Sequence, residues 1–298
     1  MLINQSVSGS ALRASGLAYW ELLKPRVTIL LTFLGAAAAV IASGADPAQS
    51  GRVALITLAV FLGSGGSNGL TNYLDRALDA RMYRTRGRSI PSGRIVSAER
   101  GLYWSAGWVL AGVMLAFLVH PLAALAGATG TLAAISFRKT EATHFLGGVS
   151  SAAPVAAGWL AMDPSLSPTI GLLGAFVGVW VIHHVWAIML FYRSDYLQAG
   201  VDIFPLRSAW RSARPLFLSL AVLLVVLVAA MGFVAEQGIV YWVMAGGFAL
   251  YNIWGTMQLE QESLSPAVQR RRFKTASYSL LCGVFTALLV TTVLTAVQ

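Results

Sequence analysis

The hydrophobic positions of this chain form long runs that short polar loops interrupt. A bilayer core requires about 20 apolar residues in one helix. By that measure the sequence predicts nine transmembrane helices, at residues 27–43, 53–74, 102–119, 121–137, 145–162, 168–192, 215–235, 238–258 and 276–296. The third and fourth are separated at His120-Pro121, because proline suits the first turn of a new helix. We therefore expect an all-α, polytopic membrane bundle.

The composition supports a membrane protein and argues against several other classes. The 298 residues are 57% hydrophobic and 11% charged, whereas about a quarter of the residues of a soluble domain are charged. The mean hydropathy is +0.69. The net charge of +9 lies in short loops rather than along one face, so we expect no nucleic-acid partner. We also expect no removable signal peptide, and one domain over residues 1–298.

The basic residues predict an orientation in the membrane. Of the 21 Lys and Arg residues, all except Arg52 lie in the N-terminal tail or in the loops after the second, fourth, sixth and eighth predicted helices. Because cytoplasmic loops carry an excess of Lys and Arg, the N-terminus and these loops are expected in the cytoplasm. The C-terminus is then outside. The segment GSGGSNG at 63–69 predicts a close approach of a neighbouring helix.

Two carboxylates stand where the second apolar run ends. Asp75 and Asp79 are four residues apart and therefore share a face of a helix, with Asn72 as a further oxygen ligand. The chain has one cysteine, Cys282, which excludes an intrachain disulfide and a multi-cysteine metal site. An oxygen-rich set beside many arginines suits Mg²⁺ and a diphosphate, since Mg²⁺ binds through one or two carboxylates plus substrate phosphates.

Structural alternatives remain open for these residues. Asp75 and Asp79 are also explained as interfacial acids that balance nearby arginines, while the arginines only fix the orientation. His183 and His184, in the sixth predicted helix, are either buried hydrogen-bonding residues or functional ligands.

Four segments of the chain resemble the UbiA superfamily of intramembrane prenyltransferases, and within it the heme O synthases. They are ELLKPRVTIL at 21–30, NYLDRALDARMYRTRGRSIPSGRI at 72–95, RKTEATHFLGG at 138–148 and HHVWAIMLFYRSDYLQAGVDIFP at 183–205. The last segment is the one that distinguishes this group from its quinone and chlorophyll relatives. The sequence departs from the pattern at Thr71, Ser89, Ile182, His183, Ser194 and Asp202, near the expected metal shell and acceptor region.

The resemblance implies a fold, two substrates and a cofactor. The helices are expected to surround a central cavity in which farnesyl diphosphate places its tail, and heme b is the expected acceptor. The implied Mg²⁺ ligands are Asn72, Asp75, Asp79 and Asp195, of which the three aspartates are catalytic. The implied diphosphate-binding residues are Arg84, Arg88, Arg138 and Lys139, and the implied acceptor-binding residues are His184, Trp186 and Tyr196.

The resemblance also implies a bacterial inner-membrane protein whose active-site loops face the cytoplasm. Two other functions remain open. One is prenyl transfer to another acceptor, such as an aromatic acid, a quinone precursor or a different tetrapyrrole. The other is a non-enzymatic membrane transporter whose basic loops bind anionic lipid. A downstream heme-modifying or oxidase partner is not identified by any residue.

Overall fold

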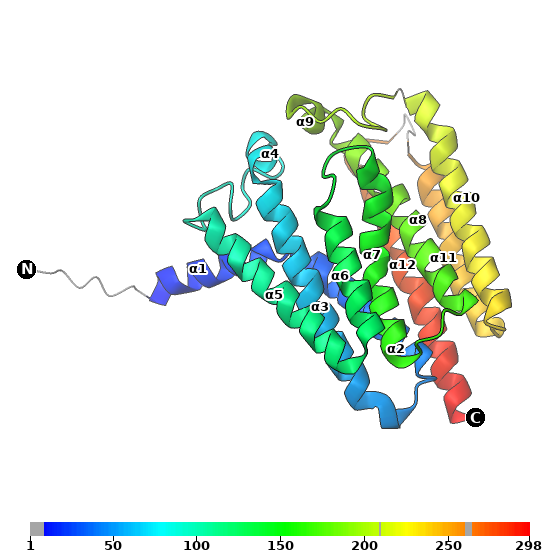
Figure 1. Cartoon of the computed structure of the whole chain (residues 1–298). Coiled ribbons are helices and arrows are strands. Elements are labelled where there is room, and N and C mark those ends of the chain that lie inside the picture. Colours follow the sequence, from blue (N-terminus) through cyan, green and yellow to red (C-terminus); the bar gives the residue numbers. More distant parts are fainter. Residues whose placement is uncertain (1–8, 209, 260–263) are drawn as a thin grey trace, which may run out of the picture.

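The protein is described by a computed structural model that covers residues 9–208, 210–259 and 264–298. Its described residues form helices and loops and no strand (Figure 1). The helices are α1 (Gly9–Leu22), α2 (Pro25–Ala42), η1 (Pro47–Gln49), α3 (Ser50–Leu74), α4 (Arg76–Arg81), α5 (Ala98–Val119), α6 (Pro121–Ile135), α7 (Ala142–Met162), α8 (Pro168–Phe191), α9 (Arg193–Gln198), α10 (Trp210–Val234), α11 (Ile239–Met257) and α12 (Pro266–Val297).

The all-helical membrane fold is confirmed, and a long helix lies at each of the nine predicted positions. Seven of the described helices are long and apolar enough to cross a membrane: α2, α3 with the preceding η1, α5, α7, α8, α10 and α12. The remaining two positions hold α6, which has 15 residues, and α11, which has 19. Nine membrane spans therefore stay a prediction. Helix α12 begins ten residues earlier than predicted, because the polar segment before Ala276 continues the helix.

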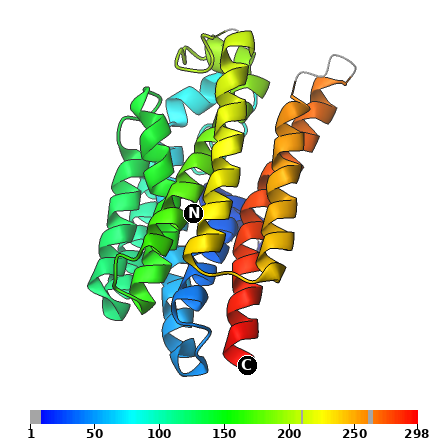
Figure 2. The same ribbon diagram turned by 90° about the vertical axis from the view of Figure 1, so that its right-hand side faces the viewer.

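The short helices α4 and α9 lie at the same end of the bundle, and the C-terminus lies at the other end (Figures 1 and 2). Each of them directly follows a long helix, α4 after α3 and α9 after α8. The polar segments that follow these two membrane helices are thus brought to one side of the molecule, where the aspartates predicted as ligands lie.

Small residues set how closely the first helices pack. A Cβ added to Gly66 would lie 2.6 Å from the carbonyl oxygen of Ser105 and 2.6 Å from the backbone nitrogen of Val109. Helices α3 and α5 therefore touch backbone to backbone, which confirms the close approach predicted from the glycines at 63–69. Helices α2 and α7 meet in the same way, since a Cβ on Gly35 would lie 2.9 Å from the carbonyl oxygen of Pro154.

Two apolar clusters form most of the core. The larger joins α2, α7, α8, α10, α11 and α12 around fully buried residues such as Phe176, Tyr241 and Phe285. The second joins α2, α3, α5, α6 and α7 and is built mainly of alanines, with Ile56 and Val60. The alanine-rich cluster closes the end of the bundle that is opposite α4, because its residues lie near the start of α3 and α6 and near the end of α5 and α7.

Replacing Gly66 tests the α3–α5 contact. Gly66→Leu inserts a side chain between two backbones and is expected to destabilise the protein by roughly 1–3 kcal/mol, seen as a lower melting temperature in detergent. The control is Gly107→Leu on α5, where an added Cβ meets no atom within 4 Å and the residue is exposed. Equal melting temperatures of the two variants would contradict the close packing.

Candidate active site

The two aspartates lie where α3 ends and α4 begins. Asp75 is the C-cap of α3, and the chain continues into α4 with a hydrogen bond from the Asp79 nitrogen to the Asp75 carbonyl oxygen at 2.8 Å. This bond preserves the four-residue helical spacing across the break. Both side chains are buried: Asp75 is 7% exposed and Asp79 is 4% exposed. Buried carboxylates require partners, because an unpaired buried charge is strongly unfavourable.

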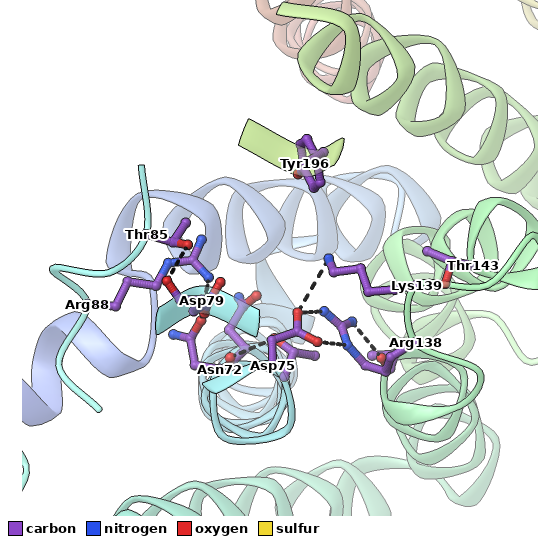
Figure 3. A network of polar contacts seen from close by, with 12 residues as sticks. Asn72, Asp75, Asp79, Thr85, Arg88, Arg138, Lys139, Thr143 and Tyr196 are labelled. Atoms are coloured by element: carbon purple, nitrogen blue, oxygen red, sulfur yellow. Dashed lines mark hydrogen bonds and ion pairs between the residues drawn. The ribbon is translucent and has the colours of Figure 1, made fainter. Parts of the chain in front are cut away.

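Asp75 is paired with the segment that connects α6 to α7. The Arg138 guanidinium donates to both carboxylate oxygens, with Nε at 2.9 Å from Oδ1, and the Lys139 ammonium lies 3.4 Å from Oδ2 (Figure 3). Burial alone would raise the pKa of Asp75, but the hydrogen bonds from Arg138 and the charges of Lys139 and Arg138 hold that pKa below its usual value. Asp75 is therefore ionised at neutral pH.

Asp79 is paired with an arginine from the loop after α4. Nη1 of Arg88 donates to Oδ2 of Asp79 at 2.6 Å and to Oδ1 of Asn72 at 3.3 Å. The Asn72 amide nitrogen donates to the Leu22 carbonyl oxygen at 2.7 Å, so its own oxygen faces Arg88. Thr85 donates to the Asp79 carbonyl oxygen at 3.1 Å, which ties the loop back to α4. In Figure 3 Asp79 and Arg88 lie on one side of Asp75, and Arg138 and Lys139 lie on the other.

Lys24, which sequence reasoning missed, is also part of this site. It precedes α2, its backbone has the left-handed φ of 51°, and its ammonium donates to Oγ1 of Thr71 at 2.9 Å. Burial, together with the nearby charges of Arg88 and Arg138, lowers the pKa of Lys24 to about 7. The signals that point to it are its position in the first resemblance block and a strained backbone that a lysine adopts only when its surroundings impose it.

Lys139 has the same two features as Lys24. Its backbone φ is 59°, again left-handed. Burial lowers its pKa, and Asp75 offsets part of that effect. The two lysines, Lys24 and Lys139, and the two arginines, Arg88 and Arg138, outnumber the two carboxylates, so the site suits an anion that carries several charges.

Asp195 does not join Asp75 and Asp79. Its two carboxylate oxygens accept hydrogen bonds from the backbone nitrogens of Tyr83 and Arg84, at 2.6 Å and 3.1 Å. Within the described part of the chain, no three His, Cys, Asp or Glu side chains gather closely enough to share a metal ion. Asp195 thus holds the arginine-rich loop against α9 in this structure.

Tyr196 and Arg84 lie beside the paired aspartates. The Arg84 guanidinium donates to the Tyr196 hydroxyl at 3.2 Å and lies 4.9 Å from the centre of the Tyr192 ring. Burial raises the pKa of Tyr196, which is 9% exposed, so its hydroxyl is protonated at neutral pH. The predicted acceptor residue Tyr196 therefore lies close to the predicted diphosphate residue Arg84.

The histidines of α8 lie apart from this site, in the packed core. His184 is 5% exposed, stacks on Trp180 with ring centres 4.8 Å apart, and bonds through Nδ1 to the Ser277 hydroxyl at 3.0 Å. His183 is fully buried and lies 3.2 Å from the Thr256 hydroxyl through Nε2. These contacts fit the structural alternative. A contact of His184 with an acceptor stays a prediction.

Trp186 joins two of the resemblance blocks. Its indole nitrogen donates to Nδ1 of His144 on α7 at 3.0 Å, and its ring meets that of Phe204 with centres 4.6 Å apart. Glu141, three residues before His144, accepts from the Phe204 nitrogen at 3.2 Å and pairs with Arg207. Trp186 thus fixes the loop after α9 against the start of α7.

A cavity of about 330 Å³ begins at the polar cluster and enters the bundle between α2, α3, α5, α6, α7 and α8. Lys24, Thr71 and Arg138 line its polar end. Glycine, alanine, serine, two threonines, Asn68 and a few larger apolar residues line the rest. The arrangement offers an anion site at the mouth of a narrow, mostly apolar chamber.

The donor atoms at this mouth suit Mg²⁺. Asn72, Asp75 and Asp79 offer only oxygen, the element that Mg²⁺ prefers, and Mg²⁺ is commonly held by one or two carboxylates together with substrate phosphates.

Comparisons with known proteins identify similar sequences. The sequence model of the UbiA prenyltransferase family matches residues 29–278. A protoheme IX farnesyltransferase from Desulforudis audaxviator is 34% identical over 77% of this chain and 74% of its own length. A protoheme IX farnesyltransferase from Dinoroseobacter shibae is 32% identical over 93% of this chain and 91% of its own length.

Solved structures share the fold at lower sequence identity. The structure of a digeranylgeranylglyceryl phosphate synthase has a TM-score of 0.74 and 17% identity, and the match covers 94% of this chain and 99% of that one. A UbiA homolog from Archaeoglobus fulgidus, bound to DMAPP and Mg²⁺, has a TM-score of 0.68 and 15% identity, with coverage of 91% and 98%.

The lysine at the cavity mouth predicts a pH dependence of anion binding. The pKa of Lys24 is about 7, and a bound diphosphate raises it, so binding above pH 7 requires uptake of a proton. The affinity for a non-hydrolysable farnesyl diphosphate analogue is therefore expected to fall by up to about tenfold per pH unit above 7.

Calorimetric titrations of the wild type and of Lys24→Met at pH 6.5 to 8.5 measure this dependence. The ionisation of the ligand itself affects both proteins equally. Affinity profiles that run parallel in the two proteins would refute the role of Lys24.

Proposed function

The chain belongs to the UbiA prenyltransferase family, and on that premise we propose that it transfers a farnesyl group from farnesyl diphosphate to the vinyl group of protoheme IX, giving heme O. The observation that carries the proposal is the pair of buried aspartates among lysines and arginines, of which Arg138, the partner of Asp75, lines the polar end of a narrow, mostly apolar cavity together with Lys24. A diphosphate with an isoprenoid tail has that distribution of charge and apolar surface. The choice of protoheme IX as the acceptor rests on the names of the similar proteins.

The proposed roles of the donor residues follow from their contacts. Asn72, Asp75 and Asp79 hold Mg²⁺, which when bound neutralises charge on the diphosphate. The guanidinium of Arg138 and the ammonium of Lys139 are already next to Asp75, and the guanidinium of Arg88 is next to Asp79. Small side-chain movements bring these groups to the phosphate oxygens as charge-assisted donors. Arg84 adds a further donor from the loop that Asp195 holds.

The bond that breaks joins C1 of the farnesyl chain to the diphosphate oxygen, and the cations stabilise the pyrophosphate as it leaves. The electron pair of the heme vinyl group forms the new bond to C1. Water then captures the cation left on the former vinyl group and releases one proton to solvent, which gives a hydroxyethylfarnesyl side chain. The protein provides no nucleophile in this scheme. It provides charge at the leaving group and an apolar chamber that keeps water from the allylic cation.

We further propose one domain over residues 1–298 in the bacterial inner membrane, with α4 and α9 on the cytoplasmic side. The basic loops support this orientation.

Tyr196 and Trp186 are proposed to border the acceptor. Trp186 lies in the last turns of α8, and Tyr196 lies in α9, which directly follows α8. Asp195 would assist in holding the metal, because a carboxylate that accepts two N–H groups retains two acceptor positions.

Mass spectrometry of the product tests the proposal. Purified protein supplied with farnesyl diphosphate, Mg²⁺ and heme b is expected to produce heme with the added mass of a farnesyl group and a hydroxyl group. Unmodified heme together with a prenylated phenol would place the protein with another acceptor. A protein that releases no pyrophosphate from farnesyl diphosphate with any of these acceptors would fit the transporter alternative instead.

Asp79 provides the sharpest test of the donor site. Asp79→Asn keeps the shape of the side chain but removes its charge, and it is expected to lower kcat at least about a hundredfold, because stabilisation of the leaving group is lost. The control is Asp163→Asn, at the end of α7 on the opposite side of the bundle. Melting temperatures of both variants separate a catalytic loss from a folding loss. Turnover of Asp79→Asn within a few-fold of the wild type would restore the view that Asp79 is only an interfacial acid.

The two alternatives for His184 differ in what its removal affects. The packing with Trp180 and the bond to Ser277 predict that His184→Ala lowers the melting temperature and weakens heme and donor binding together. Titrations with heme and with a farnesyl diphosphate analogue, beside thermal unfolding, measure this. Loss of heme binding alone, at an unchanged melting temperature, would support the acceptor contact.

A further inference from the structure

The cavity has a closed end built of small residues. At that end its lining includes Ala59 on α3, Ala116 on α5, Ala123 on α6 and Ala157 on α7, here called the alanine floor. Each of the four is at most 5% exposed. They belong to the alanine-rich core cluster, which continues beyond them to Ile56 and Ala161. The cavity therefore ends on packed core.

We propose that the alanine floor sets the length of the prenyl donor, so that three isoprene units fill the cavity and a fourth does not fit. The inference rests on the proposed function, because it concerns the tail of the same donor. It assigns a specificity role to residues that are remote from the polar cluster.

The depth of the cavity matches this length. Helix α3 lines it from Thr71, at the polar end, to Ala59, a distance of about 18 Å at 1.5 Å per residue. An extended isoprenoid advances by about 5 Å per unit, since each unit adds four bonds of roughly 1.5 Å in zigzag. Three units need about 15 Å and four need about 20 Å. With its diphosphate at the level of Asp75, a farnesyl chain reaches the alanine floor, and a geranylgeranyl chain exceeds it.

The width of the cavity points to the same occupant. A volume of about 330 Å³ spread over this length describes a narrow chamber. That shape favours one extended chain over a flat porphyrin ring. The donor tail is thus the substrate group that the chamber fits, and the acceptor approaches its mouth.

A second, more open apolar groove of about 800 Å³ provides the competing route for the tail. It lies between α6, α7 and α8 and shares Gly130 and Ala153 with the cavity. These two residues form a tight wall, because a Cβ on Gly130 would overlap the Cβ of Ala153. A tail that passed this wall would leave the cavity sideways and have no length limit. This close contact between α6 and α7 favours the alanine floor as the end of the path.

Gly127 allows the depth to be changed without disturbing the helix. It lines the cavity on α6, one turn from Ala123 toward the polar end, and an added Cβ there meets no atom within 4 Å. Gly127→Leu is expected to shorten the chamber and to shift the ratio of farnesyl to geranyl diphosphate affinity at least tenfold toward geranyl. Gly107→Leu, on the exposed face of α5, is the matched control and is expected to leave the ratio unchanged.

The opposite change enlarges the chamber. Val60 lines the cavity beside Ala59, and Ile56 lies one turn further from the polar end. The double variant Ile56→Ala/Val60→Ala is expected to raise the affinity for geranylgeranyl diphosphate relative to farnesyl diphosphate. Because deleting buried methyl groups also destabilises a protein, the melting temperature is measured in parallel, and Gly127→Leu carries the test if the double variant does not fold.

The experiment separates this inference from the proposed function. Binding of thiolodiphosphate analogues with two, three and four isoprene units tests the alanine floor, and turnover with heme b tests the reaction. A change of chain-length preference in Gly127→Leu alone supports the floor even if heme is not the acceptor. An unchanged preference in Gly127→Leu overturns the inference, whatever the turnover, and points to a tail that leaves through the side wall.

Discussion

The pairing of Asp75 with Arg138 and Lys139 is the interaction on which the site depends. The Asp75 carboxylate, buried at the end of α3, is unfavourable alone, and cations from a segment more than sixty residues away compensate it. The connection between α6 and α7 is consequently held over the end of α3. Two left-handed residues, Phe137 and Lys139, flank Arg138 and turn this connection toward Asp75. The same cations are the partners that a diphosphate needs, so one charge arrangement serves both the fold and the proposed chemistry.

Small residues have two separate effects in the bundle. Where a glycine faces a backbone, as Gly66 faces α5, it brings two helices into contact. Where a glycine faces open space within the lining, as Gly127 does, it leaves room for the cavity. The lipid side of the protein needs neither effect, and large apolar residues such as Leu118 and Phe145 are exposed there. In this membrane protein, the size of the residues rather than their polarity therefore determines where helices pack closely and where a cavity remains.

Much of the fold could be predicted from the sequence, because apolar length alone defines a membrane helix. The placement of Asp75 and Asp79 four residues apart was equally visible, since it depends on a local spacing. The contacts of Lys24, Asp195 and His184 were not visible. Each depends on which side of a nearly uniform apolar helix faces the neighbours, or on how a loop folds back. In α8 almost every residue is apolar, so no periodicity distinguishes the cavity side, where Val181 and Val185 lie, from the core side, where His184 lies.

The contact of Asp195 with the arginine-rich loop connects the two ends of the site. Its oxygens hold the backbone of Tyr83 and Arg84, while Arg84 reaches the Tyr196 hydroxyl one residue further along α9. The loop after α4 and the segment after α8 are therefore held together as one unit. Trp186 and Phe204 attach that unit to the start of α7, next to the segment that carries Arg138. All the cations proposed for the diphosphate thus belong to one connected polar layer, and a change at any of its contacts affects the geometry around Asp75.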